Sequence, residues 1–489
     1  MGSLAEESMT KIRVIGGGLA GPEAALTAAR LGCEVDLYEM RRVVDGKPHL
    51  TPAHQTMEFG ELVCSNSLKS ESEWTAPWLL KQEMRRAGSA LLRIADETAV
   101  PAGHALAVDR VEFSRRITEA IEAEPRIRVI REEVTRLDDS PVDDSPVQDQ
   151  NGTKCTIVAT GPLTSDALSK EIERLTGSGR LAFYDSISPI VDADSIDMNR
   201  VYFAARWDKG TADYINCPMD RAEYDRFYDA LLAAETAESK EWEKLDYFPP
   251  GAPEAGAQGP RHFEACLPIE VLAGRGRDTL RFGPMKPVGL RDPRTGRIPW
   301  AVVQLRKENL RADSYNLVGF QNHLKYGEQA RILRLIPGLE NARFLRYGQI
   351  HRNTYICAPI LLDETLMLKN SATRLAFAGQ ICGVEGYTES IATGLLAGIY
   401  AAGMAQGRQP TPSPRATALG SLVHYITHAD AKNFQPANIT FDLLEPLDEE
   451  TRRRVRDKKE RHRMQCERAL AAFDAWKSAS DQAVIERVP

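Results

Sequence analysis

Short apolar runs alternate with helical segments at both ends of this chain. Residues 12–15 predict a brief buried strand, a helix follows over 22–31, and residues 35–38 form a second apolar run. A third buried strand is predicted at 156–159, and residues 375–403 repeat the order of strand, glycine turn and helix. Alternation of this kind is typical of an α/β fold.

The first strand runs directly into a glycine-rich turn with the spacing G-x-G-x-x-G. Gly16 permits the tight turn, Gly18 lets the backbone approach a pyrophosphate, and Gly21 lets the helix pack closely on the strand. The N–H groups at the helix start then face the phosphates. Glu39 lies 23 residues after Gly16, where a carboxylate is expected to meet a ribose hydroxyl. The residues predicted to bind the dinucleotide here are Gly16, Gly17, Gly18, Leu19, Ala20, Gly21 and Glu39.

Two further glycine turns favour FAD over NAD as this dinucleotide. Gly161 ends the strand at 156–159, and Gly379 and Gly383 follow the strand that begins at Leu375. In two-domain flavoproteins the last strand–glycine–helix unit folds back beside the first, so that its helix start faces the flavin ring. A plain NAD dehydrogenase needs neither turn. We therefore predict bound FAD, with these three glycines among its contacts.

The character of the sequence changes at about residue 186, where strand-like pieces separated by proline and glycine surround a polar helix near 219–245. We interpret this stretch as a domain inserted into the first one. A terminal helix, acidic at its start and then basic, is predicted over about 447–478. The predicted fold class is α/β: a Rossmann-type FAD-binding domain with an inserted α+β domain and a C-terminal helical segment. The predicted parts are 10–185 and 346–446 for the FAD-binding domain, 186–345 for the inserted substrate domain, and 447–489 for the basic helix and tail.

The composition indicates the cellular compartment and argues against a membrane segment. The 489 residues carry a net charge of −7. They contain no apolar run of about 18 residues, and the first residues lack the basic and apolar segments of a signal peptide. The eight cysteines have no C-x-x-C spacing, which argues against a disulfide framework and a zinc site. We therefore expect a cytoplasmic protein without a membrane segment.

Two cysteines lie among polar residues and are candidates for chemistry. Cys64 falls in the stretch 51–70, which shows no clean period and suits a functional loop. Cys266 lies within 262–270, where a histidine and two glutamates could act as bases or hydrogen-bond partners. Most cysteines are small buried residues without a chemical role, and on the residues alone that interpretation stays open for both.

Two basic segments stand out in this acidic chain. Arg275–Arg311 holds ten lysines and arginines against three acids, together with Phe282 and Trp300, and Arg452–Arg463 holds eight against two. Basic loops with aromatic residues suit an RNA backbone with splayed bases. An ordinary solvated face, or a helix stabilised through its dipole, stays open as the alternative. Together the two segments favour a polyanionic substrate.

One pair of histidines has the spacing of metal ligands. His424 and His428 lie four residues apart, as two ligands on one helix face do. The pair lacks a nearby third ligand in the sequence and the glutamate of an H-E-x-x-H motif. The sequence therefore predicts no metal site.

These motifs together resemble those of the folate- and FAD-dependent tRNA (uracil-5-)-methyltransferase family, a small relative of the flavoprotein that modifies wobble uridines. The resemblance runs from about residue 11 to 442, and so many long motifs are far more specific than a glycine turn alone. The motifs are Ile15–Glu39, Glu61–Leu68, Val100–Arg110, Arg281–Gly289, Val318–Gln329, Tyr347–Asn353, Ala378–Gly398 and Ala418–Phe434.

The resemblance implies an unusual use of FAD. NAD(P)H reduces the flavin, which takes a one-carbon unit from 5,10-methylenetetrahydrofolate at its N5 and passes it to C5 of a T-loop uridine in tRNA. Uracil C5 is a poor nucleophile until something adds to C6, and a thiolate suits that addition. The family motif places this role on Cys266. Cys64 matches the second family cysteine, near the flavin as proton acceptor from C5 or as adduct-forming thiol, and Tyr387 is expected beside the flavin.

The implied partners are tRNA, the folate and NAD(P)H, with no obligate protein partner evident. Two other functions stay open. One is the same chemistry on a ribosomal RNA uridine, which would use identical residues. The other is a flavin-containing RNA-binding protein without methylation activity, which would need neither Cys64 nor Cys266.

Overall fold

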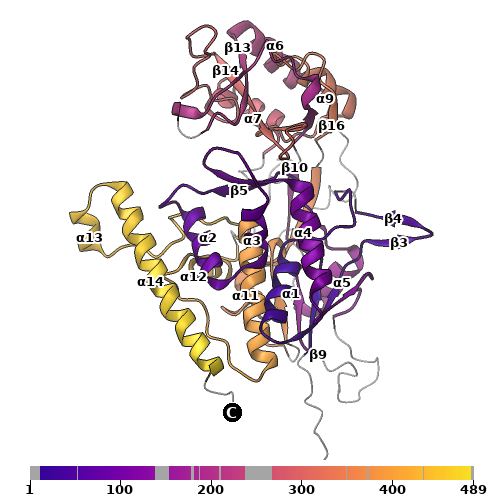
Figure 1. The fold of residues 1–489 in the computed structure, drawn as a ribbon, viewed down its shortest axis with the longest axis vertical. Helices are drawn as coiled ribbons and strands as arrows, with labels where there is room; N and C mark the ends of the chain where they lie inside the picture. The colour runs from indigo at the N-terminus through magenta and orange to yellow at the C-terminus, as the bar shows by residue number, and fades with distance from the viewer. Residues whose placement is uncertain are drawn as a thin grey trace, which may run out of the picture.

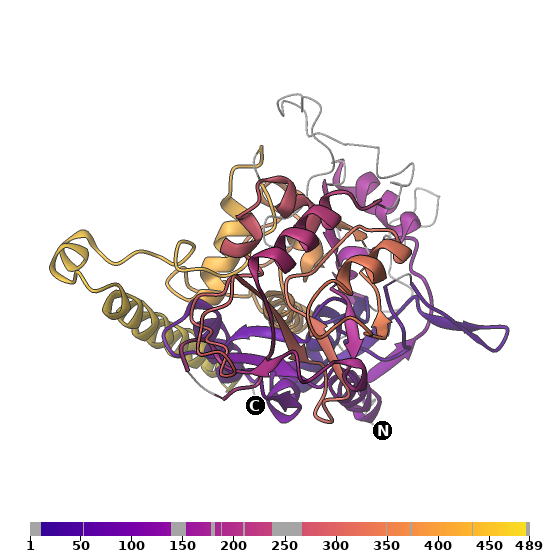
Figure 2. The ribbon, with the colours of Figure 1, turned by 90° about the horizontal axis from the view of Figure 1, so that it is seen from above.

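A computed structural model gives the arrangement of the chain. It describes residues 11–51, 53–137, 153–177, 181–186, 188–208, 211–236, 267–348, 350–371, 374–432 and 434–485. Figure 1 shows one body built around a parallel sheet, which combines N-terminal and C-terminal parts of the chain, and a second body above it, which comes from the middle of the chain. The β3–β4 hairpin (Arg42–Val44 and Lys47–His49) projects on one side and α13 (Glu449–Arg454) on the other, in Figure 1 and Figure 2 alike.

A sheet of five parallel strands forms the centre of the first body. Its order is β18-β9-β1-β2-β8, and every neighbouring pair is parallel. The strands are β1 (Lys11–Ile15), β2 (Glu34–Tyr38), β8 (Ile127–Ile130), β9 (Thr153–Val158) and β18 (Leu375–Phe377). Because β18 lies beside β9, the last predicted strand–glycine–helix unit joins the same sheet as the first. The predicted α/β class is confirmed.

Two helices that begin at the carboxyl edge of this sheet pack against each other. They are α1 (Ala20–Arg30) and α11 (Tyr387–Ala405). A Cβ on Gly394 would stand 2.3 Å from the carbonyl oxygen of Ala20, and one on Gly398 would stand 2.7 Å from that of Ala24. The glycines of α11 therefore let the two helix backbones approach closely, which aims both helix starts at one edge of the sheet.

Further helices and short sheets cover the first body. The helices are α2 (Ala76–Ala87), α3 (Ala90–Glu97), α4 (Arg110–Ala123), α5 (Asp166–Thr176), α10 (Ala358–Leu361) and α12 (Ala418–His428). A small sheet holds β5 (Ser67–Ser70), β6 (Ala99–Val100) and β7 (Ala105–Val108). The antiparallel pair β10 (Leu181–Ser186) and β17 (Ile350–Tyr355) links the two bodies, where the chain leaves the first and returns to it.

The second body has its own antiparallel sheet and its own core. Its strand order is β12-β13-β14-β15-β11-β16, and Phe227 and Phe320 are fully buried in the core. The strands are β11 (Ile190–Asp192), β12 (Tyr202–Phe203), β13 (Ile215–Met219), β14 (Ala301–Lys307), β15 (Ser314–Leu317) and β16 (Phe344–Arg346). The helices are α6 (Arg221–Leu232), α7 (Ile269–Gly274), α8 (Thr279–Phe282) and α9 (Tyr326–Leu333).

Two predicted helices differ from the structure at their ends. The polar helix expected to reach residue 245 ends at Leu232, and residues 237–266 lie outside the described part of the chain. The single terminal helix expected over 447–478 is two helices, α13 (Glu449–Arg454) and α14 (Lys458–Ile485). Val455 is extended, with φ −97° and ψ 100°, which breaks the helix between them. The boundaries of the four parts stay predictions.

The C-terminal helix α14 is tied to the first body by one apolar stripe. Phe473 is fully buried and Trp476 nearly so, and the indole of Trp476 donates to the carbonyl of Thr411 at 3.0 Å. Lys477 donates to the carbonyl of Arg86, at the end of α2. None of the helices over the described ranges is long and apolar enough to cross a membrane.

Candidate cofactor and catalytic site

A pocket with an empty volume of about 980 Å³ opens at the carboxyl edge of the parallel sheet. Three glycine turns meet there: the turn after β1, the turn after β9 at Gly161, and the turn after β18 at Gly379. Of the predicted cofactor residues, those lining it are Gly16, Gly17, Gly18, Leu19, Ala20, Glu39, Gly161, Gly379 and Tyr387. The structure therefore brings together residues that lie more than 350 positions apart in the sequence (from Gly16 to Tyr387).

Gly21 and Gly383 shape the pocket from behind and do not line it. A Cβ on Gly21 would lie 1.8 Å from the carbonyl oxygen of Gly16, so only glycine lets α1 start there. Gly383 has φ +93°, and a Cβ on it would lie 2.3 Å from the ring of Phe434. The sequence predicted that both glycines contact the cofactor, whereas in the structure they allow the turns behind the pocket to form.

The first glycine turn fits a dinucleotide. Gly16 has φ +117°, and a Cβ there would stand 2.4 Å from the carbonyl oxygen of Ala159. A Cβ on Gly18 would meet no atom within 4 Å, so the backbone faces open space at the pocket wall. The N-terminal end of α1 follows at Ala20. An open backbone at a helix start is what a pyrophosphate requires.

Glu39 lies where a ribose contact is expected, and its carboxylate also hydrogen-bonds to the backbone of the glycine turn. Its Oε2 accepts a hydrogen bond from the backbone N–H of Gly17 at 2.7 Å, and its Oε1 accepts from the backbone N–H of Arg41 at 2.8 Å. Burial raises the pKa of the Glu39 carboxyl, but the charge and hydrogen bonds of Arg41 outweigh it and lower the pKa overall. Glu39 is therefore ionised, and its oxygens keep capacity for further donors.

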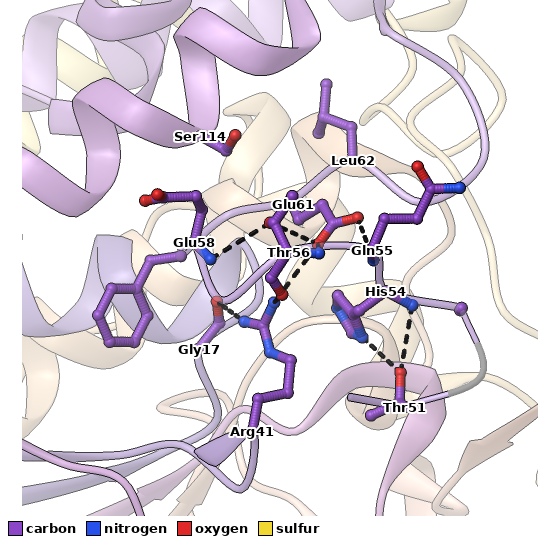
Figure 3. Close-up of polar contacts among 12 residues, drawn as sticks. Gly17, Arg41, Thr51, His54, Gln55, Thr56, Glu58, Glu61, Leu62 and Ser114 are labelled. Atoms are coloured by element: carbon purple, nitrogen blue, oxygen red, sulfur yellow. Dashed lines mark hydrogen bonds and ion pairs between the residues drawn. The ribbon is translucent and has the colours of Figure 1, made fainter. Parts of the chain in front are cut away.

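Arg41 organises the loop over this pocket, and sequence reasoning missed it. Its side chain is 1 % exposed and donates to the carbonyl oxygen of Thr56 at 3.2 Å, while its guanidinium lies 3.6 Å from Glu61. Glu61 in turn accepts from the backbone N–H groups of Gln55 (2.8 Å) and Thr56 (3.0 Å). Figure 3 shows the side chains of Arg41 and Glu61 meeting at Thr56. The only signal in the sequence was an arginine two residues after Glu39.

His54 makes this loop sensitive to acid. Burial and the charge of Arg41 lower its pKa from 6.5 to about 4, and its Nδ1 lies 2.5 Å from Oγ1 of Thr51. Between these two values the unfolded chain binds a proton that the folded chain does not, so stability falls as the pH drops from about 6.5 toward 4. We expect His54→Gln to lose less of its free energy of unfolding between pH 7 and pH 5 than the parent chain, measured by urea denaturation. An equal loss in both proteins would contradict the assignment.

Cys64 lies beside Tyr387 at the edge of the pocket. The Tyr387 hydroxyl donates to Sγ of Cys64 at 3.1 Å and accepts from the backbone N–H groups of Cys64 (2.8 Å) and Ser65 (3.2 Å). Burial and the neighbouring sulfur raise the pKa of Tyr387 well above 10, so the phenol keeps its proton. The first residue of α11 thus fixes the position of the loop that carries Cys64.

Two arginines place positive charge near this sulfur. Arg110 and Arg346 both interact electrostatically with Cys64 and Tyr387. Arg110 also pairs with Glu308 of the second body through a hydrogen bond of 2.8 Å, and burial, with the charge of Arg110, lowers the pKa of Arg346. Positive charge and a donated hydrogen bond stabilise negative charge on a sulfur. Sequence reasoning missed both arginines as site residues, although Arg110 closes one of the motifs that carry the family resemblance.

Asn66 connects the Cys64 loop to both bodies. Its side-chain amide donates at 2.9 Å to the carbonyl of Val108 and at 2.9 Å to that of Lys307, which ends β14.

Cys266 itself lies outside the described residues, and the described chain resumes at Leu267. Glu270, at the start of α7, accepts from the backbone N–H of His323 at 2.7 Å, and burial raises its pKa to about 7.

The basic segments carry less unpaired charge than their composition suggests. Arg277 pairs with Asp225 and Asp229, and Arg294 pairs with Asp292. In the C-terminal segment Arg453 and Arg463 pair with glutamates on their own helices. Phe282, by contrast, is 78 % exposed. These ion pairs weaken the electrostatic argument for a polyanionic partner, whereas the exposed Phe282 lies within the first segment.

A Rossmann-type sheet with three glycine turns around one pocket defines a dinucleotide-binding protein of the flavoprotein class. Solved structures of Aquifex aeolicus GidA share the fold: one superposes with a TM-score of 0.61 at 19% identity, over 85% of this chain and 67% of that one.

Comparison with known sequences identifies the family within the flavoprotein class. The family model for glucose inhibited division protein A (GidA) matches residues 11–409. The methylenetetrahydrofolate--tRNA-(uracil-5-)-methyltransferase TrmFO of Koribacter versatilis is 66% identical over 96% of this chain and 98% of its own length. That of Bacillus cytotoxicus is 50% identical over 94% and 97%. The chain belongs to the methylenetetrahydrofolate--tRNA-(uracil-5-)-methyltransferase family, which confirms the resemblance of its motifs.

Proposed function

We propose that this protein methylates C5 of a T-loop uridine in tRNA, with FAD as cofactor, 5,10-methylenetetrahydrofolate as carbon donor and NAD(P)H as reductant. Membership of the family supports the reaction class, the folate donor and the tRNA substrate. The single structural observation that supports it most is the contact between Cys64 and Tyr387 at the edge of the pocket. It puts a nucleophilic atom beside the place expected for the flavin.

The residues of the pocket fit FAD. The backbone at Gly16–Ala20 would hold the pyrophosphate, Glu39 a ribose hydroxyl, and the start of α11 at Tyr387 the flavin end. Bound FAD would supply the hydride and one-carbon transfer chemistry. The protein contributes the position of that group and the reactive side chains around it.

The chain's own cysteines perform the nucleophilic part of the proposed reaction. The Cys266 thiolate adds to C6 of the uracil, which makes C5 nucleophilic, and it leaves again when the proton on C5 is removed. Cys64 lies near Arg110 and Arg346 and receives a hydrogen bond from Tyr387, so negative charge on its sulfur is stabilised. We assign to Cys64 the acceptance of that C5 proton, with formation of a covalent adduct as its alternative role.

The Tyr387 hydroxyl is expected to position Cys64. Tyr387→Phe removes one hydrogen bond to the sulfur and the acceptor of two backbone N–H groups, each bond contributing about 0.5–1.5 kcal/mol. We expect kcat to fall about 10- to 100-fold, with the flavin content unchanged because the ring of residue 387 remains. The measurement is 5-methyluridine formation alongside the absorbance of bound flavin. Full activity in Tyr387→Phe would show that the hydrogen bonds do not position the sulfur.

One incubation separates the proposed function from its alternatives. The purified protein is mixed with an unmodified tRNA transcript, methylenetetrahydrofolate and NADPH, and the RNA is digested and searched for 5-methyluridine. Product at the T-loop position supports the proposal. Product on ribosomal RNA alone selects the other substrate, and binding of RNA without product on any RNA selects the binding protein.

Two further assignments belong to this proposal. The basic segments Arg275–Arg311 and Arg452–Arg463 hold the RNA strand while the uridine leaves its stack. The second body, over the predicted boundaries 186–345, is the substrate domain. Its Glu308 already contacts Arg110 beside Cys64, so RNA bound there lies close to the cysteine loop. We also propose a cytoplasmic location, which the cysteine spacing supports.

A further inference from the structure

The histidine pair at the end of α12 has a third neighbour that the sequence did not reveal. His424 and His428 stack with ring centroids 4.4 Å apart and an interplanar angle of 17°. Glu364, from the turn after α10, lies with its carboxylate 3.7 Å from Nε2 of His428. One ligand atom from each of the three side chains lies within 4.8 Å of the other two. The structure therefore supplies a third potential ligand, which the sequence near the two histidines does not offer.

The hydrogen bonds around His428 orient it as a ligand. The Thr427 hydroxyl donates to the carbonyl of Val423 at 2.8 Å, so it accepts at its oxygen from Nδ1 of His428 at 2.9 Å. With Nδ1 held by Thr427, the other ring nitrogen, Nε2, is the one that faces the carboxylate of Glu364. An imidazole nitrogen and a carboxylate oxygen that face each other at this distance can both bind one divalent cation. A hydrogen bond to the second ring nitrogen is also the usual support of a metal-binding histidine.

His424 has charged neighbours of both signs. Arg415 donates to the hydroxyl of Ser421 at 2.5 Å, and its charge also opposes a bound cation, whereas the charge of Glu364 attracts one. Glu364 and His428 have side chains 50 % and 49 % exposed, which gives an ion a path from solvent.

We propose that Glu364, His424 and His428 form a binding site for a divalent transition-metal ion, with Zn²⁺ as the expected occupant. Two imidazoles and one carboxylate are a ligand set that suits Zn²⁺ and leaves a coordination position for water. The site joins the last turn of α12 to the segment after α10.

A metal at this place would restrain a segment that supports the cofactor pocket. The chain after α12 packs the ring of Phe434 against Gly383, and the backbone of Ala437 is hydrogen-bonded to Gly383 and Glu385. These residues lie directly before Tyr387 at the start of α11. Metal binding therefore stabilises the turn behind the pocket and is expected to raise the melting temperature of the holoenzyme.

The test is metal binding by the full-length holoenzyme without an affinity tag. Zn²⁺ is titrated by calorimetry after chelator treatment, and Co²⁺ is used as a spectroscopic probe. We expect one ion per chain, a tetrahedral cobalt absorption band without the sulfur-to-cobalt charge-transfer band, and at least about tenfold weaker binding in His428→Asn and His424→Asn. Glu364→Gln is expected to weaken binding in the same direction.

His104→Asn is the matched control, because His104 is exposed and lies in a different part of the fold. It is expected to bind as the parent chain does. Thr427→Val tests the orientation of His428 without removing a ligand, and is also expected to weaken binding. Absence of stoichiometric binding, unchanged binding in His428→Asn with an unaltered far-ultraviolet spectrum, or a cobalt–sulfur band would each overturn the proposal.

Discussion

Cys266→Ala is expected to lose 5-methyluridine formation by at least about 10³-fold while the protein remains yellow. The physical reason is that C5 of uracil lacks the electron density to accept a one-carbon unit until a nucleophile has added to C6. An alanine offers no such nucleophile, and water is a poor substitute for a thiolate. The residues proposed to hold the flavin come from other segments, so its retention is expected to be unaffected. The measurement is product formation in single turnover, with flavin content from absorbance.

The matched control for this variant is Cys155→Ala. Cys155 is buried in β9, and burial raises its pKa to about 12, so it is an unreactive core residue. Its replacement is expected to change stability and leave the chemistry unaltered. Retained methylation in Cys266→Ala would remove that cysteine from the nucleophile role and transfer attention to Cys64.

Gly18→Val is expected to weaken FAD binding at least about 100-fold without unfolding the protein. A Cβ at this position meets no atom within 4 Å, and Gly18 is outside the left-handed backbone region, so the side chain fits the cofactor-free fold. The same side chain occupies the space into which the pyrophosphate must come. We expect a nearly unchanged melting temperature of the cofactor-free protein and a colourless preparation, checked by calorimetry and by flavin titration.

Gly21→Ala is the contrasting variant in the same turn. Its added Cβ would lie 1.8 Å from the carbonyl oxygen of Gly16, so α1 must shift away from β1. Overpacking of this kind costs about 1–3 kcal/mol, and the cofactor-free protein is expected to melt earlier. If Gly18→Val lowered the melting temperature as much as Gly21→Ala, or retained FAD, the assignment of Gly18 to the pyrophosphate would be wrong.

The features of the fold that sequence reasoning located correctly are those that follow from spacing along a short stretch. The turn at Gly16–Gly21 and the strands beside it are defined by local backbone geometry, which glycine and apolar periodicity report directly. The terminal helix was less predictable. No glycine or proline marks the break at Val455, so the local sequence pattern predicted one continuous helix.

The contacts that it did not predict join residues far apart in the sequence. Tyr387 meets Cys64 across 323 positions of sequence, and Asn66 meets Lys307 across 241. Glu364 completes the histidine cluster at the end of α12 from about 60 positions away. No periodicity encodes such pairs, because they form only when the sheet and both bodies are in place.

The sequence by itself determined the class of fold, the glycine turn after β1 and, through its motifs, the family. Local spacing suffices for these because strands, turns and helix starts form from neighbouring residues. Only the tertiary structure decided which side chains surround the pocket and in which state of charge. In the folded chain Arg41 lowers the pKa of Glu39, and burial raises that of Tyr387, because burial and neighbouring charges control these values. Folding also brings Glu364 beside two histidines.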